Sequence, residues 1–265
     1  MSLRTPTLLG AVALVMAAPA LAQETGDESR LVFNVSLGWA SGGDLWAVPN
    51  QPVLDISATD TFNVQRNMSE TWAAGMSGTY YKGSHIGIGV DLLLVNLQYN
   101  DTCQLAFASG SVANADTCAS INGSGLSALS SQLTGTVIYR FASRSPVSPF
   151  IRANAGIMVA NLNTTRLSGF YVNEDDLTVE VPIYTNSDQT RISPVGAIGA
   201  GVTFAIARAY HLRIEARGSS YTLNTVTGPN SSIGGDARTE AKRKTQLTLM
   251  VGVDLLLERS RGRRY

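Results

Sequence analysis

Residues 242–258, with the sequence KRKTQLTLMVGVDLLLE, decide the fold class of this chain. Every second side chain in the later part of this stretch is apolar, namely Leu247, Leu249, Val251, Val253, Leu255 and Leu257. The residues between them are mostly polar or small, with Leu256 as the exception. Because successive side chains of a strand point to opposite faces, the stretch predicts a strand with one apolar and one polar face. The apolar face is long enough for a tilted strand to cross a bilayer, which takes about 9–11 residues, so we interpret it as the closing strand of a membrane β-barrel.

Seven earlier segments show a similar alternation, although the pattern is less regular in residues 70–81. They span residues 31–39, 70–81, 86–99, 129–141, 150–162, 195–207 and 211–223. Short links at 82–85, 142–149 and 208–210 alternate with long links at 40–69, 100–128, 163–194 and 224–241. Outer-membrane barrels have short periplasmic turns and longer extracellular loops. The predicted fold class is therefore all-β, an eight-stranded antiparallel up-and-down transmembrane β-barrel with both termini in the periplasm.

Aromatic residues gather toward the two ends of these segments, where the two membrane interfaces would lie. The short-turn end has Tyr80, Tyr81, Tyr139, Phe141, Phe150, Phe204 and Tyr210. The long-loop end has Trp39, Trp46, Trp72, Tyr99 and Tyr221. Transmembrane barrels carry aromatic girdles at both interfaces, so we interpret the two groups as such girdles.

The first 22 residues have the pattern of a cleaved signal peptide. Arg4 supplies a positive start, residues 8–18 are apolar, and Ala20-Leu21-Ala22 fits the cleavage rule. The apolar run is too short for a membrane-spanning helix, which favours cleavage over an anchor. We expect a signal peptide at 1–22 and a barrel domain at 23–265, ending in the basic tail 259–264. Charged residues make up 15% of the chain and the net charge is zero, which does not favour nucleic acid as a partner.

The segment 23–265 resembles the small outer-membrane β-barrel families of Gram-negative bacteria, such as the OmpA transmembrane domain, OmpX and OmpW. The resemblance lies in the pattern of eight strands and not in a fixed motif. It implies a location in the cell outer membrane, contact with outer-membrane lipid and lipopolysaccharide, and a porin-like barrel in the cell envelope. Such families usually end in an aromatic residue that closes the last strand and serves as an assembly signal, whereas here Tyr265 follows the basic tail.

Six charged residues fall on the polar faces of the strands and at comparable depths, so the barrel would turn them inward. They are Asp91, Arg152, Arg213, Glu215, Arg217 and Asp254. An eight-stranded barrel has an interior just wide enough for side chains to fill, and unpaired charges there would be costly. We expect a paired network that plugs the lumen, in which Glu215 and Asp254 pair with the arginines. A gate or a narrow solute path is the alternative interpretation. Replacing Arg213 or Arg217 by Glu should lower thermal stability in detergent.

The long links carry the other candidate sites. Cys103 and Cys118 lie close together in the exported chain, where an oxidising compartment favours a disulfide between them. Most exposed acids are expected there as well: Asp44, Asp55, Asp60, Asp101, Asp116, Asp188, Asp236 and the run Glu174-Asp175-Asp176. The acidic run matches no calcium-loop pattern, and the cysteine and histidine content indicates no metal site. We expect no cofactor, and a surface partner that binds through these loops.

Catalysis is not expected, because both histidines, His85 and His211, fall in short turns at the periplasmic end. A Ser–His–acid site at the outer rim therefore cannot form. The expected function is structural or surface-interacting, in an integral outer-membrane barrel with a plugged lumen. One alternative is a narrow channel for small or apolar solutes, as in OmpW-like proteins. A less favoured alternative is a soluble periplasmic barrel that binds a ligand, with its apolar faces turned inward. The sequence leaves the oligomeric state open.

Overall fold

The computed structural model describes residues 30–258, except 55–58, 108–109, 123–124, 144, 162–165, 186–189, 208 and 231–237. The predicted signal peptide at 1–22, the basic tail and Tyr265 lie outside the described residues, as do Asp55, Asp188 and Asp236. No helix in the described part of the chain is long and apolar enough to span a membrane.

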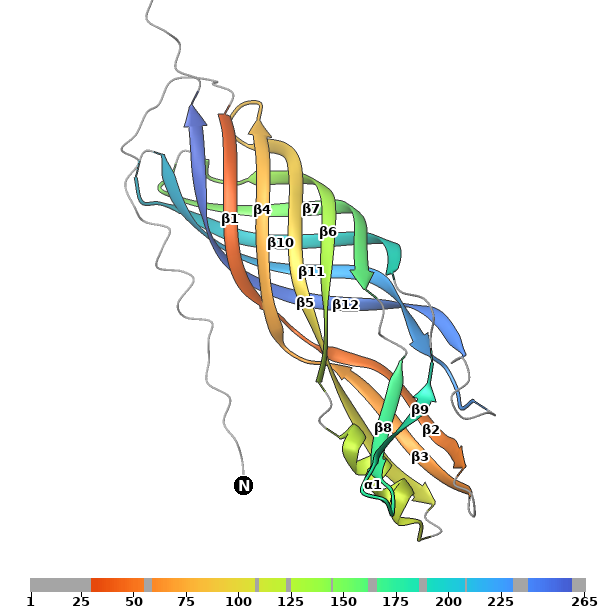
Figure 1. Ribbon diagram of the computed structural model, residues 1–265. Coiled ribbons are helices and arrows are strands. Elements are labelled where there is room, and N and C mark those ends of the chain that lie inside the picture. The colour runs from red at the N-terminus through yellow and green to blue at the C-terminus, as the bar shows by residue number, and fades with distance from the viewer. Residues whose placement is uncertain are drawn as a thin grey trace, which may run out of the picture.

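Eight strands close into an antiparallel ring (Figure 1). They are β1 (Arg30–Ala40), β4 (Thr71–Tyr81), β5 (Ile86–Phe107), β6 (Gly125–Arg140), β7 (Val147–Asn161), β10 (Thr190–Ala205), β11 (Tyr210–Val226) and β12 (Thr239–Glu258). The ring closes between the first and the last strand, where Arg30 pairs with Glu258 and Ala40 with Thr248. All eight strands predicted from sequence are therefore present, and the described chain begins and ends at the short-turn end of the barrel.

The alternation of side chains sets the inside and outside of the barrel. Leu247, Leu249 and Val251 on β12 are about half exposed on the outer surface, whereas Thr248 and Met250 face the interior and are buried. The other strands repeat this arrangement, so an apolar band encircles the barrel and polar side chains fill much of its interior. A soluble ligand-binding barrel would have the opposite arrangement. Because an apolar exterior around a closed barrel is the mark of bacterial outer-membrane proteins, this chain is an outer-membrane β-barrel.

The aromatic girdles differ in part from the prediction. Six of the aromatic side chains are exposed on the outer surface: Tyr80, Tyr139, Phe141, Tyr210, Trp39 and Trp72. Five are buried instead: Tyr81, Phe150, Tyr99, Tyr221 and Trp46. The interpretation was wrong for these five because Tyr81, Phe150, Tyr99 and Tyr221 take inward positions of the alternation, while Trp46 packs in a part of the chain that was expected to be an irregular loop.

The long links are folded, which corrects the expectation of plain loops. The first forms β2 (Gly43–Leu54) and β3 (Thr59–Met68), and β3 pairs with the outer end of β5. The second contains that outer end of β5 and the helix α1 (Val112–Ile121). The third forms a separate hairpin of β8 (Leu167–Val172) and β9 (Thr178–Tyr184). We call β2, β3, the part of β5 beyond Tyr99, α1, β8 and β9 the outer cap.

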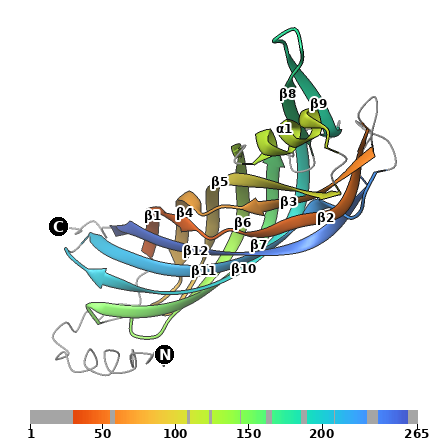
Figure 2. The same cartoon turned by 90° about the horizontal axis from the view of Figure 1, so that it is seen from below.

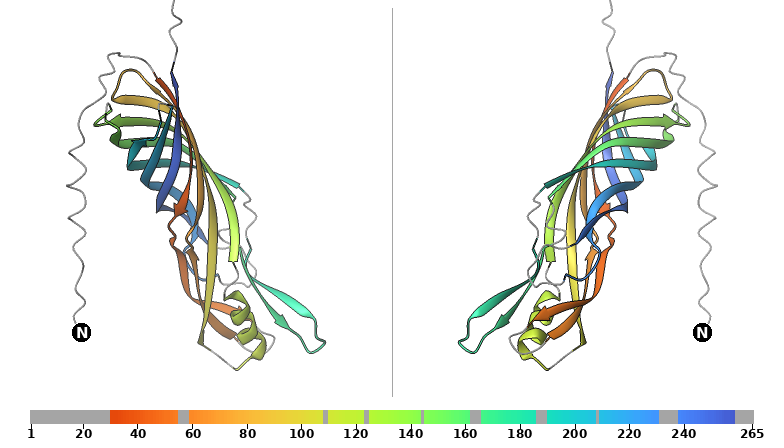
Figure 3. Two further views of the ribbon diagram at one scale, coloured as in Figure 1. Left: turned by 90° about the vertical axis from the view of Figure 1, so that its left-hand side faces the viewer. Right: turned by 90° about the vertical axis from the view of Figure 1, so that its right-hand side faces the viewer.

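The outer cap lies wholly at the long-link end of the barrel, away from both ends of the described chain (Figure 1). The β8–β9 hairpin projects to one side of it, and α1 lies beside the hairpin (Figure 3). Buried apolar residues run without interruption from the upper barrel interior into the outer cap, including Leu93, Tyr99, Phe62 and Leu45. The cap and the upper barrel thus share one hydrophobic core.

Candidate functional site

The lumen holds an ion-pair network built around Glu215. Its carboxylate accepts hydrogen bonds from three guanidinium groups: Arg213 Nη2 at 2.7 Å, Arg217 Nε at 3.0 Å and Arg152 Nη1 at 3.1 Å. Arg213, Glu215 and Arg217 alternate along β11, so the strand places all three on its inner face. No residue in this group is more than 4% exposed.

Asp91 connects the network to the opposite wall of the barrel. From β5 it accepts a hydrogen bond from Arg217 Nη1 at 2.7 Å and another from Arg152 Nη2 at 2.9 Å. Arg152 stands on β7, so the network ties β5, β7 and β11 together across the lumen. Gly199 on β10 leaves room for it, because a Cβ there would lie 3.0 Å from Glu215 Oε1 and 3.1 Å from Arg152 Cγ.

Asp254 lies at the edge of the network toward the short-turn end. Its Oδ1 accepts a hydrogen bond from Asn34 Nδ2 at 2.8 Å, and it forms longer ion pairs of 3.8 Å with Arg213 and Arg140. The Arg140 guanidinium stacks over the Tyr81 ring, 4.1 Å from its centre. The structure therefore brings all six sequence-selected charges together, and it adds Arg140 as a seventh.

Polar neighbours complete the coordination of the arginines. Arg152 donates from Nε to Asn154 Oδ1 at 3.0 Å and from Nη2 to Thr136 Oγ1 at 3.1 Å, and Asn154 in turn donates to Thr134 Oγ1 at 3.0 Å. Sequence analysis gave Asn154, Thr134 and Thr136 no role. Arg140 shares the polar face of β6 with Thr134 and Thr136, and this alternation was the signal that could have added it to the network.

Apolar side chains line part of the lumen above the charges, which sequence analysis missed. Leu93, Val95 and Leu97 of β5 face inward with Met158 and Tyr221, and all are buried. The signal was present in Leu92-Leu93-Leu94-Val95, which is apolar on both faces of the strand and so breaks the alternation. The hydroxyls of Tyr99 and Tyr221 have no hydrogen-bond partner among the described residues.

A second buried ion pair lies within the outer cap. Arg66 of β3 donates from Nη2 to Asp101 Oδ2 at 2.6 Å and to the carbonyl oxygen of Arg166 at 2.8 Å. Its guanidinium lies 5.4 Å from the centre of the Trp46 ring and 5.8 Å from that of Tyr99. Sequence analysis treated Asp101 as an exposed loop acid, which was wrong because Asp101 is 2% exposed in this pair.

The remaining loop acids have different surroundings. Asp60 was also expected to be exposed, but it is 1% exposed and accepts a hydrogen bond from Asn114 of α1 at 2.8 Å. Asp44 and Asp116 are exposed in the cap. The acidic run Glu174-Asp175-Asp176 forms the exposed turn of the β8–β9 hairpin. In the described part of the chain, no group of three His, Cys, Asp or Glu side chains is placed to hold a metal ion.

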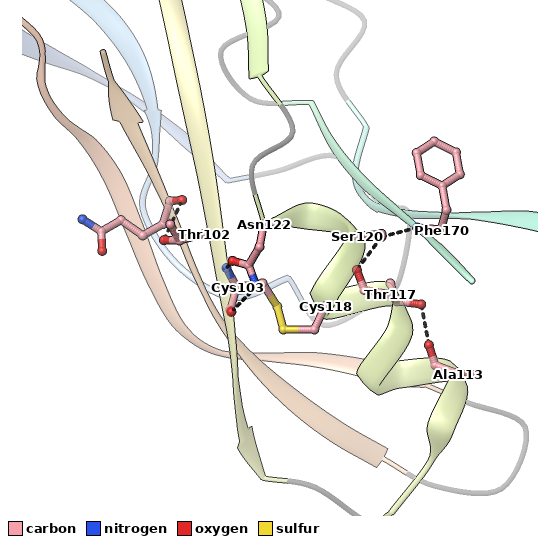
Figure 4. The surroundings of a disulfide bond; sticks show 9 residues. Thr102, Cys103, Ala113, Thr117, Cys118, Ser120, Asn122 and Phe170 are labelled. Carbon is pink, nitrogen blue, oxygen red and sulfur yellow. Dashed lines mark hydrogen bonds between the residues drawn. A yellow bond between two sulfur atoms is a disulfide. The ribbon is translucent and has the colours of Figure 1, made fainter. Parts of the chain in front are cut away.

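Cys103 and Cys118 form a disulfide that attaches α1 to β5 (Figure 4). Asn122, just after the helix, reinforces the attachment, because its side chain accepts from the Cys103 amide at 2.8 Å and donates to the Cys103 carbonyl at 3.1 Å. Ser120 then links the helix to the hairpin by accepting a hydrogen bond from the Phe170 amide at 2.7 Å. The disulfide, the helix and the hairpin thus form one connected unit.

Comparisons with known proteins find distant structural similarities. No protein-family model matches the sequence, and no curated protein matches it. Neisserial surface protein A is similar in structure, with a TM-score of 0.43 and 11% identity over 85% of this chain and 96% of that chain. The N-terminal β-barrel domain of Pseudomonas aeruginosa OprF has a TM-score of 0.35 and 10% identity over 86% of this chain and 97% of that chain.

Escherichia coli outer membrane protein W is also similar, with a TM-score of 0.32 and 15% identity over 84% of this chain and 97% of that chain. The fold assignment itself rests on the strand register and on the apolar exterior of this chain, and these distant similarities add no detail about its role.

Proposed function

We propose that this chain is a non-enzymatic outer-membrane barrel whose lumen is closed by its charge network and whose outer cap carries a surface-interaction role. One observation carries the proposal. Asp91, Arg152, Arg213, Glu215 and Arg217 bond to one another across the lumen, so the groups that could line a water-filled path are occupied by each other. The long links, in contrast, fold into the outer cap, which extends beyond the apolar band of the barrel.

The placement of the histidines supports a non-enzymatic role. His85 lies in the short turn between β4 and β5, where its Nδ1 is 2.8 Å from the Arg140 carbonyl oxygen. His211 is the second residue of β11, at the same end of the barrel. Neither imidazole can reach the outer cap, where a surface substrate would arrive.

Single-channel recording in planar bilayers tests the closed lumen. We expect no steady unit conductance from the folded chain. The double variant Glu215→Ala, Arg217→Ala removes two side chains from the centre of the network, and we expect it to produce one. The matched control is Glu240→Ala, Arg243→Ala, which removes the same charges from the outer end of β12. A steady conductance of the unaltered chain would refute the closed lumen.

A narrow path for apolar solutes is the second candidate, and the apolar upper lumen favours it. Leu93, Val95 and Leu97 would line such a path down to the charge network. Transfer of an apolar fluorescent dye into liposomes that contain the folded chain tests this candidate. Accelerated transfer that is slowed by Val95→Trp would favour the path over a closed barrel.

A further inference from the structure

The β2–β3 hairpin of the outer cap and the outer ends of barrel strands β11 and β12 line a small, partly open cavity. The cavity has a volume of about 260 Å³ and lies between β2, β3, β11 and β12. Figure 2 shows the outer ends of β11 and β12 beside β2. Leu45 and Trp46 lie behind its surface, because both are almost fully buried in the core. Gln65, Thr225 and Thr227 supply polar groups around it.

Two lysines on one strand also line this cavity. Lys242 and Lys244 are separated by a single residue, so β12 directs both to the same face. Lys244 Nζ donates to the carbonyl oxygen of Asp44 at 2.8 Å, which is a neutral acceptor. Asp44 is the single acid among the lining residues, so the cavity carries two positive charges and one negative charge.

The ammonium groups of Lys242 and Lys244 repel each other in this cavity. Burial, together with repulsion from Lys242, lowers the pKa of Lys244 below its ordinary value. An anion in the cavity would relieve this repulsion and accept charge-assisted hydrogen bonds from both lysines. The volume lies just below the roughly 300–1,000 Å³ of drug-sized ligand sites, so the occupant must be small.

We propose that the cavity between β2, β3, β11 and β12 binds a carboxylate or phosphate group carried by a single sugar unit, with Lys242 and Lys244 as the anion-binding residues. The polar groups of Gln65, Thr225 and Thr227 in the lining would face the hydroxyls of the sugar. The lysines stand only a few residues beyond Leu247, the outermost apolar residue of the band on β12. At that height the sugar could belong either to an outer-leaflet glycolipid or to a free anionic saccharide. The site deepens the proposed surface role and rests on it.

Isothermal titration tests the site with the full mature chain folded in an uncharged detergent. The probes are glucose 1-phosphate and glucuronate, with glucose as the uncharged comparison. We expect both anions to bind and glucose not to bind. Removal of a charge-assisted hydrogen bond costs about 1.5–3 kcal/mol, so Lys242→Gln should weaken binding by about tenfold or more. The variant with both lysines changed should abolish it.

The matched control is Arg243→Gln, which removes the same charge from the opposite face of the same strand. Its guanidinium donates to Ser220 Oγ at 2.6 Å and does not line the cavity. A mobility shift between unboiled and boiled gel samples shows that each variant is folded. The proposal fails if no anion binds, if Lys242→Gln binds as well as the unaltered chain, or if Arg243→Gln weakens binding equally.

A competition experiment distinguishes the two sources of the sugar. The chain is placed in phosphatidylcholine liposomes with or without lipid A, and glucose 1-phosphate binding is measured in both. Competition by lipid A assigns the site to a glycolipid headgroup, and equal binding assigns it to a free saccharide. These results are independent of channel conductance, so failure of the anion site and failure of the closed lumen can be told apart.

Discussion

At the scale of single residues, Glu215 decides whether the lumen is stable. Three arginine side chains converge on its carboxylate, and Asp91 is shared by two of them. Such a cluster is costly to bury, but once it is buried each member depends on the others. The loss of one carboxylate leaves buried cationic groups without a counter-charge, whereas solvent screens the loss of an exposed charge.

We therefore expect Glu215→Gln to destabilise the folded barrel strongly. Gln has nearly the same shape, so the change removes charge and leaves packing intact. Removal of one partner from a buried ion pair costs about 3–5 kcal/mol. The midpoint temperature of the mobility shift on unboiled gels should fall, and that of the exposed control Glu240→Gln should not. Equal midpoints for the two variants would show that the network contributes little to stability.

Charge reversal at Arg217 extends the same argument. Arg217→Glu would place a carboxylate beside both Asp91 and Glu215, which now lie 2.7 and 3.0 Å from the guanidinium nitrogens. We expect an even lower midpoint than for Glu215→Gln. The double variant Asp91→Arg, Arg217→Glu restores opposite charges and should recover part of the loss. A double variant no more stable than Arg217→Glu alone would argue against direct pairing of the two positions.

At the scale of elements, the outer cap depends on one close contact between α1 and β8. Gly169 packs directly on the helix, and a Cβ there would lie 2.6 Å from both the Thr117 carbonyl oxygen and its Cγ2. A two-stranded hairpin is marginally stable alone in water. The helix therefore serves as the platform on which the hairpin is held, and the Cys103–Cys118 disulfide holds the platform.

We expect Gly169→Ala to separate the hairpin from the helix and leave the barrel unchanged. The Phe170 amide, which donates to Ser120 Oγ at 2.7 Å, should then exchange its hydrogen much faster. Gly228→Ala is the control, because a Cβ there meets no atom within 4 Å. Hydrogen exchange measured by NMR in detergent micelles reports both. Unchanged protection of Phe170 in Gly169→Ala would mean that the hairpin holds its place without this contact.

At the scale of the whole molecule, the apolar exterior decides where the chain folds. Val251 lies near the middle of the apolar band on β12 and is 48% exposed on the outer surface. A lipid tail can cover this surface, but water covers it at a cost. The bilayer is therefore part of the folded state. Outside the bilayer, water surrounds the cap, so a charged side chain on its surface is not penalised.

Val251→Arg should consequently impair folding into lipid. Arginine on the lipid face near the bilayer centre costs about 2–4 kcal/mol. Urea titration of folding into phosphatidylcholine vesicles should show a lower midpoint. The control is Val112→Arg on α1, which is 73% exposed in the cap and should fold like the unaltered chain. Equal midpoints would place Val251 outside the hydrocarbon region and would contradict the assigned membrane position of the barrel.

The sequence by itself determined the ring of eight strands, because alternation with a period of two is a local property of each segment. The same alternation placed Asp91, Arg152, Arg213, Glu215, Arg217 and Asp254 in the lumen. It also distinguished short turns from long links, from which we predict the orientation of the barrel relative to the membrane.

Only the tertiary structure decided how residues from different strands meet. The pairing of Arg66 with Asp101 and the burial of Tyr99, Tyr221 and Trp46 depend on strand register and on the path of the links. Neither is a local property, and a one-residue change of register turns every side chain to the other face. The cavity beside Lys242 and Lys244 arises in the same way, because it forms where the β2–β3 hairpin packs against the outer ends of β11 and β12, which are distant in sequence.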